Sequence, residues 1–523
     1  MSPYFFSLGI SDDRYFSRTF STKKERKRKR AEMAESKKET IVMFPFMGQG
    51  HIIPFLALSL QLEQRGFNII FVNTPLNIKK LRQSLPPSST LRLRDLPFHS
   101  SDHPGLPPSA ENFDALPYPL VIKFLQASKS LQPHFRSFLA DLVRGGDPPL
   151  AVVGDIFFGW SAEVVNELGL FHVVFSGCGG FGFACYYSTW LNLPHLKTDS
   201  PEFSLPDFPE AGKFHVTQLA ASYLAADGND PWSIFQRENL SAWLNSNGIL
   251  FNSISELDKI GLAYFQRKLS RPVWAIGPVI LPVQVRSGKQ PAISPEKCVE
   301  WLDSKPPNSV LYISFGSMNT ISASQMMQLA KALGQILNIN FIWVVRPPLG
   351  FDITADFKAE EWLPEDFTEK VVKTQNRGII VSQWAPQLEI LSHKSVGAFL
   401  THCGWNSVLE SLSQGVPIIG WPLAAEQFFN AKFLVEDVGV CLEVARGSSF
   451  EVRCDDIVEK IEKVMMGDSV KGMEMRKRAG EVKELIRKAV RSDDQLKGSS
   501  VKAMDDFLDA ALLMKEKTKS VDQ

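Results

Sequence analysis

The chain has 523 residues, more than one hydrophobic core usually serves, so two or more domains are expected. Its composition, 44% hydrophobic and 22% charged, is that of an ordinary globular protein. Basic and acidic residues balance at 57 each, and this even charge argues against a nucleic-acid-binding protein.

The cysteines and the apolar stretches indicate the compartment. The six Cys residues form no C-x-x-C pair, which argues against a disulfide framework or a zinc site and favours a reducing cytosol. No apolar stretch approaches the roughly 18 residues that span a bilayer. The end of the chain, Leu512–Gln523, is polar. We therefore expect a cytoplasmic protein without stable membrane insertion, and a monomer by default.

Residues 1–38 are expected to be a leader outside the folded protein. They include the basic run Lys23–Arg30, which is typical of a nuclear address, a surface-binding tail or, with the Ser and Arg before it, a transit peptide. Asp12 and Asp13 argue against the transit peptide. The sequence Met-Ala-Glu at 33–35 resembles a fresh start, so we favour a disordered or artefactual leader and keep targeting as the alternative.

From residue 39 to 280 the chain alternates short apolar runs with longer amphipathic segments. This alternation is typical of a parallel α/β sheet. A helix is expected over 51–67, directly after the first run. The predicted strands are Thr40–Phe46, Asn68–Thr74, Ala151–Phe158, His172–Gly177, Gly248–Ser253 and Val273–Val279.

Residues 281–297 lack periodicity and contain three Pro, which indicates an interdomain linker. Alternation resumes over 298–495 and predicts a second α/β domain of the same kind. The predicted strands are Ser309–Ser317, Phe341–Pro347, Gly378–Trp384, Val396–His402 and Val416–Pro422. The fold class is therefore α/β, with two Rossmann-like domains. A last helix is expected within 496–523, over Ser500–Leu513.

A strand-to-helix turn in the second domain forms a candidate phosphate site. The buried strand Val396–His402 is followed by the predicted helix Trp405–Gly415, so the turn falls at Cys403 and Gly404. Gly404 lets the chain bend tightly. The helix start offers unpaired N–H groups and the positive end of the helix dipole, which stabilise a phosphate.

The side chains around this turn suit a nucleotide. His402, Asn406 and Ser407 cluster at the helix start. Glu410 lies four residues beyond Asn406 on the same helix face, where its carboxylate can accept two hydrogen bonds from a ribose diol. Trp384, at the end of the preceding strand, is suited to stack on a flat base.

The segment Trp384–Gln427 resembles, over all of its 44 residues, the plant secondary-product box of the family-1 UDP-glycosyltransferases. By that resemblance Trp384 stacks on uracil and Ala385 meets the uracil edge through its backbone. The ribose contacts fall to Gln387 and Glu410, and the diphosphate contacts to His402, Asn406 and Ser407. The sugar contacts fall to Trp405, Glu426 and Gln427.

The resemblance also implies a fold and a donor. It implies the GT-B fold, in which two parallel-sheet domains face each other across a cleft. The acceptor would bind to residues 39–280 and the UDP-sugar to residues 298–495, and the helix within 496–523 would return to the first domain. A final Gln such as Gln427 is associated with glucose, whereas Glu426 stands where the family often has Asp. The resemblance therefore predicts the UDP part of the donor more firmly than the identity of its sugar.

A base is needed to take the proton of the acceptor hydroxyl. His51 directly follows Gly48, Gln49 and Gly50 at the start of the first helix, and by resemblance it is the base. Asp155 ends the strand 151–155 and by resemblance is its partner, fixing the tautomer and stabilising the imidazolium. The alternative readings make His51 a cap or surface residue and Asp155 a helix cap.

The reaction that follows is an inverting hexosyl transfer. Direct attack of the acceptor on the anomeric carbon would turn a UDP-α-glucose into a β-glucoside. The leaving diphosphate would be stabilised by the helix dipole, His402 and N–H groups, because no Asp-x-Asp metal site is present and no cofactor is needed beyond the UDP-sugar. Ser317 would add a phosphate contact, or its Gly-Ser sequence is merely a tight turn.

Other functions are weighed against transfer. The G-x-G of the first turn resembles a dinucleotide motif, but Pro54 replaces its third Gly and the next strand lacks an acidic end, so a dehydrogenase is rejected. A UDP-sugar epimerase or a non-catalytic UDP-sugar-binding protein is the alternative. The aromatic segment Phe175–Leu191 either forms ordinary core or offers a flat surface for a flavonoid, phenolic or terpenoid acceptor.

Overall fold

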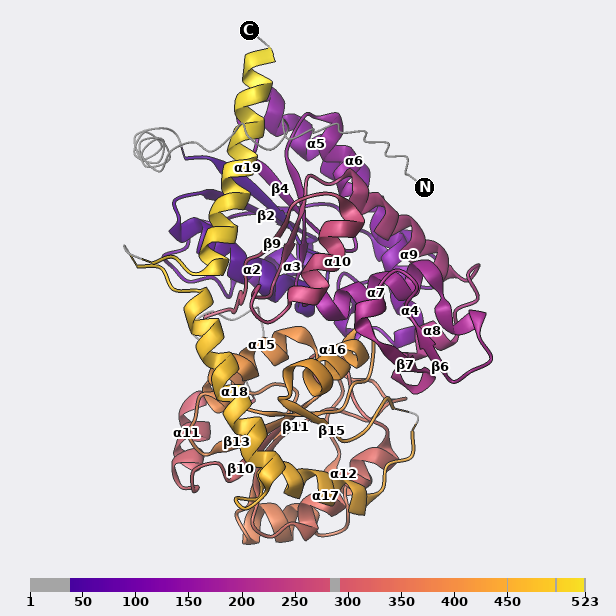
Figure 1. Cartoon of the computed structure of the whole chain (residues 1–523), viewed down its shortest axis with the longest axis vertical. Helices are drawn as coiled ribbons and strands as arrows, with labels where there is room; N and C mark the ends of the chain where they lie inside the picture. Colours follow the sequence, from indigo (N-terminus) through magenta and orange to yellow (C-terminus); the bar gives the residue numbers. More distant parts are fainter. Residues whose placement is uncertain (1–37, 283–291, 449, 494–495, 522–523) are drawn as a thin grey trace, which may run out of the picture.

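The computed structural model describes residues 38–282, 292–448, 450–493 and 496–521. It has two lobes, one formed by the first half of the chain and one by the second, and a long C-terminal helix that runs back along the first lobe (Figure 1). The leader 1–37 and residues 283–291 of the expected linker lie outside the described residues. In the structure the second lobe's first helix, α11, begins at Pro295.

The first lobe is built on a seven-stranded parallel sheet with the order β3-β2-β1-β4-β5-β8-β9. Its strands are β1 Thr40–Phe44, β2 Asn68–Asn73, β3 Arg92–Asp95, β4 Ala151–Asp155, β5 His172–Ser176, β8 Ile249–Phe251 and β9 Val273–Ala275. Its helices are α2 Gln49–Gln64, α3 Pro75–Arg82, α4 Tyr118–Ala127, α5 Leu131–Arg144, α6 Ser161–Glu167, α7 Gly180–Asn192, α8 Ala221–Leu224, α9 Pro231–Ala242 and α10 Lys259–Leu269. A separate antiparallel pair is formed by β6 Glu202–Ser204 and β7 Lys213–His215.

The second lobe holds a six-stranded parallel sheet with the order β12-β11-β10-β13-β14-β15. Its strands are β10 Val310–Ser314, β11 Asn340–Val345, β12 Gly378–Ser382, β13 Val396–Thr401, β14 Ile418–Gly420 and β15 Cys441–Glu443. Its helices are α11 Pro295–Asp303, α12 Ala323–Gln335, α13 Ala359–Trp362, α14 Gln387–Leu391, α15 Trp405–Gln414, α16 Gln427–Phe433, α17 Cys454–Met465 and α18 Val470–Ala489.

Both sheets reverse their strand order at one point, and that point locates the candidate sites. In the first sheet the order turns between β1 and β4, and in the second between β10 and β13. Open α/β sheets bind ligands outside the carboxyl ends of the strands at this reversal. The prediction of two Rossmann-like α/β domains is confirmed.

The strands that sequence analysis missed are polar or very short. β3, with the sequence Arg-Leu-Arg-Asp, is a mostly exposed edge strand, so it has no apolar run to detect. β15 has only three residues. Several predicted strands end earlier than expected. β1 stops at Phe44 and β12 at Ser382, because the residues that follow turn across the carboxyl edge of the sheet.

The two lobes share an apolar interface beside the sheet edges. The ring of Phe181 on α7 stacks on that of Phe433 on α16, with centroids 4.9 Å apart. Phe429, also on α16, contacts the rings of Phe214 and Tyr223 in the first lobe. Phe181 therefore belongs to the core, as one of the two readings of Phe175–Leu191 had it.

The C-terminal helix connects the lobes a second time. α18 lies along the second lobe, and α19, Ser499–Val521, packs on the first (Figure 1). Phe507 of α19 contacts the ring of Trp274 on β9, with centroids 5.7 Å apart. Asp505 accepts a hydrogen bond from Arg65 on α2 at 3.0 Å. The chain is thus anchored across both domains.

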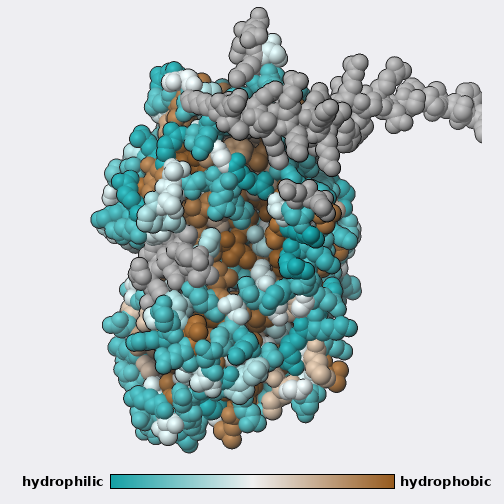
Figure 2. Space-filling view, turned by 90° about the vertical axis from the view of Figure 1, so that its left-hand side faces the viewer, coloured by the Kyte–Doolittle hydropathy of each residue, from teal (hydrophilic) through white to brown (hydrophobic). Residues whose placement is uncertain are grey.

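The polarity of the surface and the state of the cysteines relate to the expected cytoplasmic location. Figure 2 shows a mainly hydrophilic face with hydrophobic residues gathered near its middle. Within the described ranges, no helix has both the length and the apolar character needed to cross a bilayer. All six cysteines are free thiols. A cytoplasmic location stays a prediction.

The crossing of α7 and α10 depends on Gly261. A Cβ at Gly261 would lie 2.0 Å from the backbone N of Phe181 and 2.1 Å from the carbonyl carbon of Gly180, so the helix backbones touch there. The two first amides of α7, those of Gly180 and Phe181, donate to the buried carboxylate of Asp258 just before α10. Burial raises the pKa of Asp258 to about 6.

We expect Gly261→Ala to lower the stability by about 1–3 kcal/mol or more, because both helix backbones must shift to admit the methyl group. The midpoint of thermal unfolding measures this loss. Gly480→Ala is the matched control, since Gly480 lies inside α18 and its Cβ would meet no atom within 4 Å. There alanine should be neutral or stabilise by up to about 1 kcal/mol. Equal effects of the two substitutions would contradict this account.

Candidate functional site

His51 and Asp155 meet at the strand reversal of the first sheet. His51 lies in the first turn of α2, which follows β1, and Asp155 is the last residue of the neighbouring strand β4. The Nδ1 of His51 lies 2.9 Å from Oδ2 and 3.1 Å from Oδ1 of Asp155. Parallel neighbouring strands bring their carboxyl ends together, which is why residues 104 positions apart form this pair.

The pair is enclosed by aromatic rings. Phe46, Phe113 and Phe157 surround the imidazole, with ring centroids 5.1–5.9 Å from its own. Asp155 is 1% exposed, whereas the His51 side chain keeps 17% of its surface accessible. A contact from Nδ1 to the carboxylate leaves Nε2 as the ring nitrogen that can accept a proton.

Burial lowers the pKa of His51, but the charge and the hydrogen bond of Asp155, together with the charges of Glu426 and Asp114, raise it more, so the pKa lies above its ordinary value of 6.5. Asp155 does not cap the next helix. Its Oδ1 accepts from the backbone N–H of Phe157 at 3.0 Å, and α6 begins only at Ser161, without a side-chain cap. The capping alternative for Asp155 is therefore wrong.

The turn between β13 and α15 lies at Cys403 and Gly404, as predicted, but its backbone conformation differs from the expected one. Cys403, rather than Gly404, adopts the left-handed conformation, with φ of 62°. Gly404 is needed for a different reason, since a Cβ there would come within 2.4 Å of Nε2 of His402. The expectation that Gly404 makes the tight bend is corrected. Its missing side chain makes room for the imidazole of His402.

His402 is neutral at physiological pH. Burial, followed by the positive charge of Arg346, lowers the pKa of His402 to about 4. Its Nδ1 lies 3.2 Å from the hydroxyl of Thr401. With this pKa, His402 carries no positive charge at physiological pH in the protein alone, and its contact with the diphosphate stays a prediction. A neutral imidazole can donate or accept one hydrogen bond at Nε2, and the site needs another cation.

Gln387 and Glu410 form one hydrogen-bonded group. The Nε2 of Gln387 donates to Oε2 of Glu410 at 2.6 Å and to Oγ of Ser407 at 3.1 Å. The hydroxyl of Tyr312 on β10 donates to Oε1 of Gln387 at 3.1 Å. Burial raises the pKa of Glu410 to about 7. Sequence analysis missed Tyr312. This residue lies in the middle of a buried apolar strand, where a tyrosine hydroxyl needs a hydrogen-bond partner, and that was its one signal in the sequence.

Trp405 and Asn406 reach the first lobe. The indole N–H of Trp405 donates to the carbonyl of Asn252 at 2.6 Å, and the ring is 3% exposed. The Nδ2 of Asn406 donates to the carbonyl of Gly50 at 3.0 Å, next to His51. The indole of Trp405 is thus occupied by the domain interface, and its backbone N–H at the helix start is the group left for a sugar.

Glu426 and Gln427 stand at the start of α16, opposite His51. Burial raises the pKa of Glu426, and among smaller causes the charge of His51 opposes the rise, so the two groups are electrostatically coupled. The Oε1 of Gln427 accepts from the backbone N–H of Leu423 and Ala424 at 3.0 and 2.9 Å. Its Nε2 has no hydrogen-bond partner in the described part of the chain and can donate to a ligand.

The remaining predicted residues flank this group. Trp384 lies two residues beyond β12 and is half-buried, and Ala385 is 2% exposed. Ser317 lies three residues beyond β10, on a turn whose Gly316 has φ of 81°. All the predicted donor residues thus line the carboxyl edge of β12, β10, β13 and β14. In the ranges that the structure describes, no three His, Cys, Asp or Glu side chains are arranged to hold a metal ion.

The first lobe contains a second cluster of aromatic rings. The ring of Trp232 stacks on Tyr118 and on Trp190, with centroids 6.2 Å apart in each pair, and Trp190 lies 4.7 Å from Tyr223. The buried Tyr223 hydroxyl, Trp190 indole N–H and Gln236 Oε1 find no partner among the described residues. Buried polar atoms are seldom left unsatisfied, so such a cluster suits a ligand with polar groups.

The cluster adjoins the donor residues. Burial, followed by the charges of Tyr186 and Glu426, raises the pKa of Tyr223 well above its ordinary value. Glu426 therefore acts on both Tyr223 and His51. Of the segment Phe175–Leu191, Tyr186 and Trp190 contact this cluster and, like Phe181, are buried in the core, so the core reading is confirmed for these three residues and the acceptor surface stays a prediction.

Two family models together match residues 37–478 of the chain. Residues 37–281 match the model described as "Glycosyltransferase, N-terminal domain", and residues 278–478 match "UDP-glucoronosyl and UDP-glucosyl transferase". Among curated relatives, UDP-glycosyltransferase 92A1 of Arabidopsis thaliana is 50% identical over 92% of this chain and 99% of its own. Crocetin glucosyltransferase 3 of Crocus sativus is 44% identical over 82% and 91%.

Solved structures resemble the whole molecule. UGT73P12 of Glycyrrhiza uralensis, in complex with glycyrrhetinic acid 3-O-monoglucuronide, superposes with a TM-score of 0.78 at 30% identity and covers 93% of this chain and 98% of its own. UGT2 of Phytolacca americana, in complex with UDP-2-fluoro-glucose and pterostilbene, gives a TM-score of 0.72 at 27% identity and covers 90% and 99%. These relatives bind a UDP-sugar or a small acceptor in a structure of this shape.

Proposed function

This chain belongs to the plant family-1 UDP-glycosyltransferases, and from that membership we propose that it transfers glucose from UDP-glucose to a hydroxyl of a small lipophilic acceptor, with inversion at the anomeric carbon. It is a glycosyltransferase with the GT-B fold. The proposal concerns the identity of the general base, of the sugar and of the acceptor. The observation that carries them is the His51–Asp155 pair facing Glu426 across the domain boundary.

In the proposed reaction His51 is the general base. The acceptor hydroxyl gives its proton to Nε2 of His51 while its oxygen attacks the anomeric carbon. The bond from that carbon to the β-phosphate oxygen breaks, and its electron pair leaves with UDP. Asp155 holds the Nδ1–H tautomer and stabilises the imidazolium that forms. Because one displacement occurs, the configuration inverts.

The donor contacts follow from the residues at the edge of the second sheet. Trp384 stacks on uracil, Ala385 meets its edge, and Gln387 with Glu410 binds the ribose. The diphosphate lies at the start of α15, where free backbone N–H groups and the helix dipole favour an anion. We propose that no metal or further cofactor takes part. The diphosphate contacts are His402, Asn406, Ser407 and Ser317, and the sugar contacts are the backbone of Trp405 with Glu426 and Gln427.

The glucose preference rests on Gln427 and Glu426. The Nε2 of Gln427 is a rigidly held donor, because its Oε1 is bonded to two backbone amides. A buried carboxylate at Glu426 can accept from two neighbouring hydroxyls. Together they suit a sugar with adjacent equatorial hydroxyls such as glucose. The acceptor is proposed to be a flavonoid, phenolic or terpenoid that binds to the first lobe on the side of His51.

Product analysis tests the proposal. The protein is incubated with UDP-glucose, UDP-galactose and UDP-glucuronic acid, each with a mixed panel of flavonoid, phenolic and terpenoid acceptors, and products are identified by mass and by the anomeric coupling in NMR. We expect a β-glucoside formed from UDP-glucose, without added metal and in the presence of EDTA. Conversion of UDP-glucose to another UDP-sugar without glycoside formation would favour the epimerase alternative. Light scattering tests the proposed monomer.

A further inference from the structure

Arg346 is a buried cation that forms no hydrogen bond or ion pair with the residues that the structure describes. It directly follows β11 and is 8% exposed. Its Nε is enclosed and unbonded, and no hydrogen bond or ion pair of its guanidinium is formed within the described ranges. Burying a charge without a partner costs several kcal/mol, so such a group is retained where a ligand compensates it. Sequence analysis did not single out this residue.

A second buried arginine of the same domain shows what a structural role requires. Arg377, just before β12, is also 8% exposed. Its guanidinium donates to the backbone carbonyls of Ile336 and Ile339 at 2.6 and 3.2 Å, and of Leu333 and Gly334 at 3.1 and 3.3 Å. The domain therefore satisfies a guanidinium fully where it only supports the fold. Arg346 forms no such hydrogen bond with any described residue.

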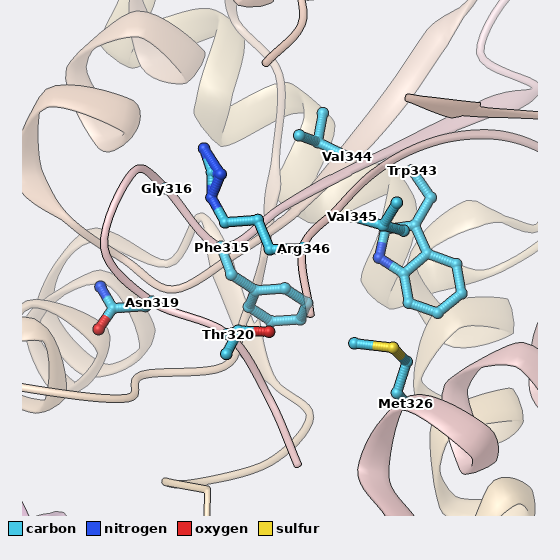
Figure 3. A pocket seen from close by; sticks show the side chains of 9 residues that line it. All are labelled: Phe315, Gly316, Asn319, Thr320, Met326, Trp343, Val344, Val345 and Arg346. Atoms are coloured by element: carbon cyan, nitrogen blue, oxygen red, sulfur yellow. The ribbon is translucent and has the colours of Figure 1, made fainter. Parts of the chain in front are cut away.

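The guanidinium of Arg346 lies at the candidate diphosphate site. It lines a small hollow together with Gly316, on the turn that follows β10, and Figure 3 shows the guanidinium turned toward that turn. A Cβ at Gly316 would lie 2.7 Å from Nε2 of His402. Since β11, β10 and β13 are neighbours, Arg346, Gly316 and His402 form a row across their carboxyl ends.

Among the described residues, the carboxylate that acts on Arg346 is that of Asp114. Burial lowers the pKa of Arg346, and the carboxylate of Asp114, in the first lobe, opposes this effect. Asp114 itself accepts from the backbone N–H of Gln49 at 3.1 Å, just before His51. A guanidinium stays charged at physiological pH in any case, whereas His402 is neutral. Arg346 is thus the fixed positive charge beside the phosphate-binding turn.

We propose that Arg346 binds the diphosphate of the UDP-sugar and stabilises the negative charge that builds up on the β-phosphate as the bond to the sugar breaks. This inference rests on the proposed donor site. Arginine binds phosphate oxygens through two parallel N–H donors, and such a contact is strong where water is excluded. Arg346 then supplies the charge that His402 does not.

The test compares UDP with uridine, which lacks the phosphates. Affinities of both are measured by calorimetry for wild type, Arg346→Gln, Arg346→Lys and the control Arg377→Gln. In Arg346→Gln the affinity for UDP should fall about 10- to 100-fold, while the affinity for uridine changes less than about twofold. Arg346→Lys, which keeps the charge but not the paired donors, should lose about 3- to 10-fold for UDP. Arg377→Gln should unfold at a lower temperature with an unchanged ratio of the two affinities.

Each outcome decides a separate point. If wild type binds neither UDP nor uridine, the proposed donor site is wrong. If wild type binds both and Arg346→Gln keeps the wild-type ratio of affinities, or loses both ligands equally, the Arg346 inference is overturned, because the residue then only holds Asp114 or the fold. Should Arg346→Gln fail to fold, an unchanged ratio in Arg346→Lys overturns the inference.

Discussion

Replacing His51 by alanine is expected to lower the kcat of sugar transfer by about 100- to 10,000-fold, which is the usual contribution of a positioned general base. His51 is the residue whose Nε2 remains free to take a proton, since its Nδ1 faces the Asp155 carboxylate at 2.9 Å. Without it, water must accept the proton of the acceptor hydroxyl. The measurement is the rate of glycoside formation at saturating UDP-glucose and acceptor.

The donor site should survive this change. His51 belongs to the first lobe and the predicted uridine, ribose and phosphate contacts to the second, so the affinity for UDP in calorimetry should stay within about twofold. His134→Ala is the matched control, because His134 lies on the exposed face of α5, away from both sites. That variant should transfer sugar at the wild-type rate. Turnover of His51→Ala close to that of His134→Ala would remove His51 from the mechanism.

Asp155→Asn is expected to lower kcat by about 100- to 10,000-fold, although the side chain keeps its size. An amide can donate to Nδ1 of His51, and this favours the tautomer that carries its proton on Nε2, where the base must be free. The substitution also removes the negative charge that stabilises the imidazolium. Asp155 is 1% exposed, so bulk water does not reach this position to stabilise the imidazolium in its place.

The pH profile separates this role from a loss of folding. In wild type the pKa of His51 lies above 6.5, because Asp155, with smaller contributions from Glu426 and Asp114, outweighs the lowering by burial. Only neutral His51 acts as a base, so kcat/KM should fall as the pH drops through that pKa. In Asp155→Asn the burial effect dominates, the pKa falls, and the acid limb of the residual activity should move to lower pH. An unmoved acid limb, or turnover within twofold of wild type, would contradict the assignment.

The sequence was sufficient for the elements and for the candidate residues near them. Apolar runs separated by amphipathic helices predict parallel sheets, and a residue that directly follows such a run stands at the carboxyl edge of its sheet. His51, Asp155 and His402 were found in this way. Arg346 lies inside the predicted strand Phe341–Pro347 and directly follows β11 in the structure, so it could have been found by asking which polar residue stands near the end of every predicted strand.

Several roles depended on contacts that no local pattern contains. Trp405 donates its indole N–H to Asn252, 153 positions away, so its ring belongs to the domain interface. Gly404 is required by the imidazole of His402, while Cys403 takes the left-handed conformation. The short polar strand β3 forms only because β2 offers it a free edge. Each of these results comes from neighbours brought together by the fold.

The amino-acid sequence by itself determined the two α/β domains, most of their strands and the family resemblance, because hydrophobic periodicity and turn residues act over a few positions. Only the tertiary structure decided the charge states of the site. Burial lowers the pKa of His402 to about 4, whereas Asp155 raises that of His51. Desolvation and the distance to the nearest charge set these values. Both quantities arise only when segments far apart in the chain are packed together.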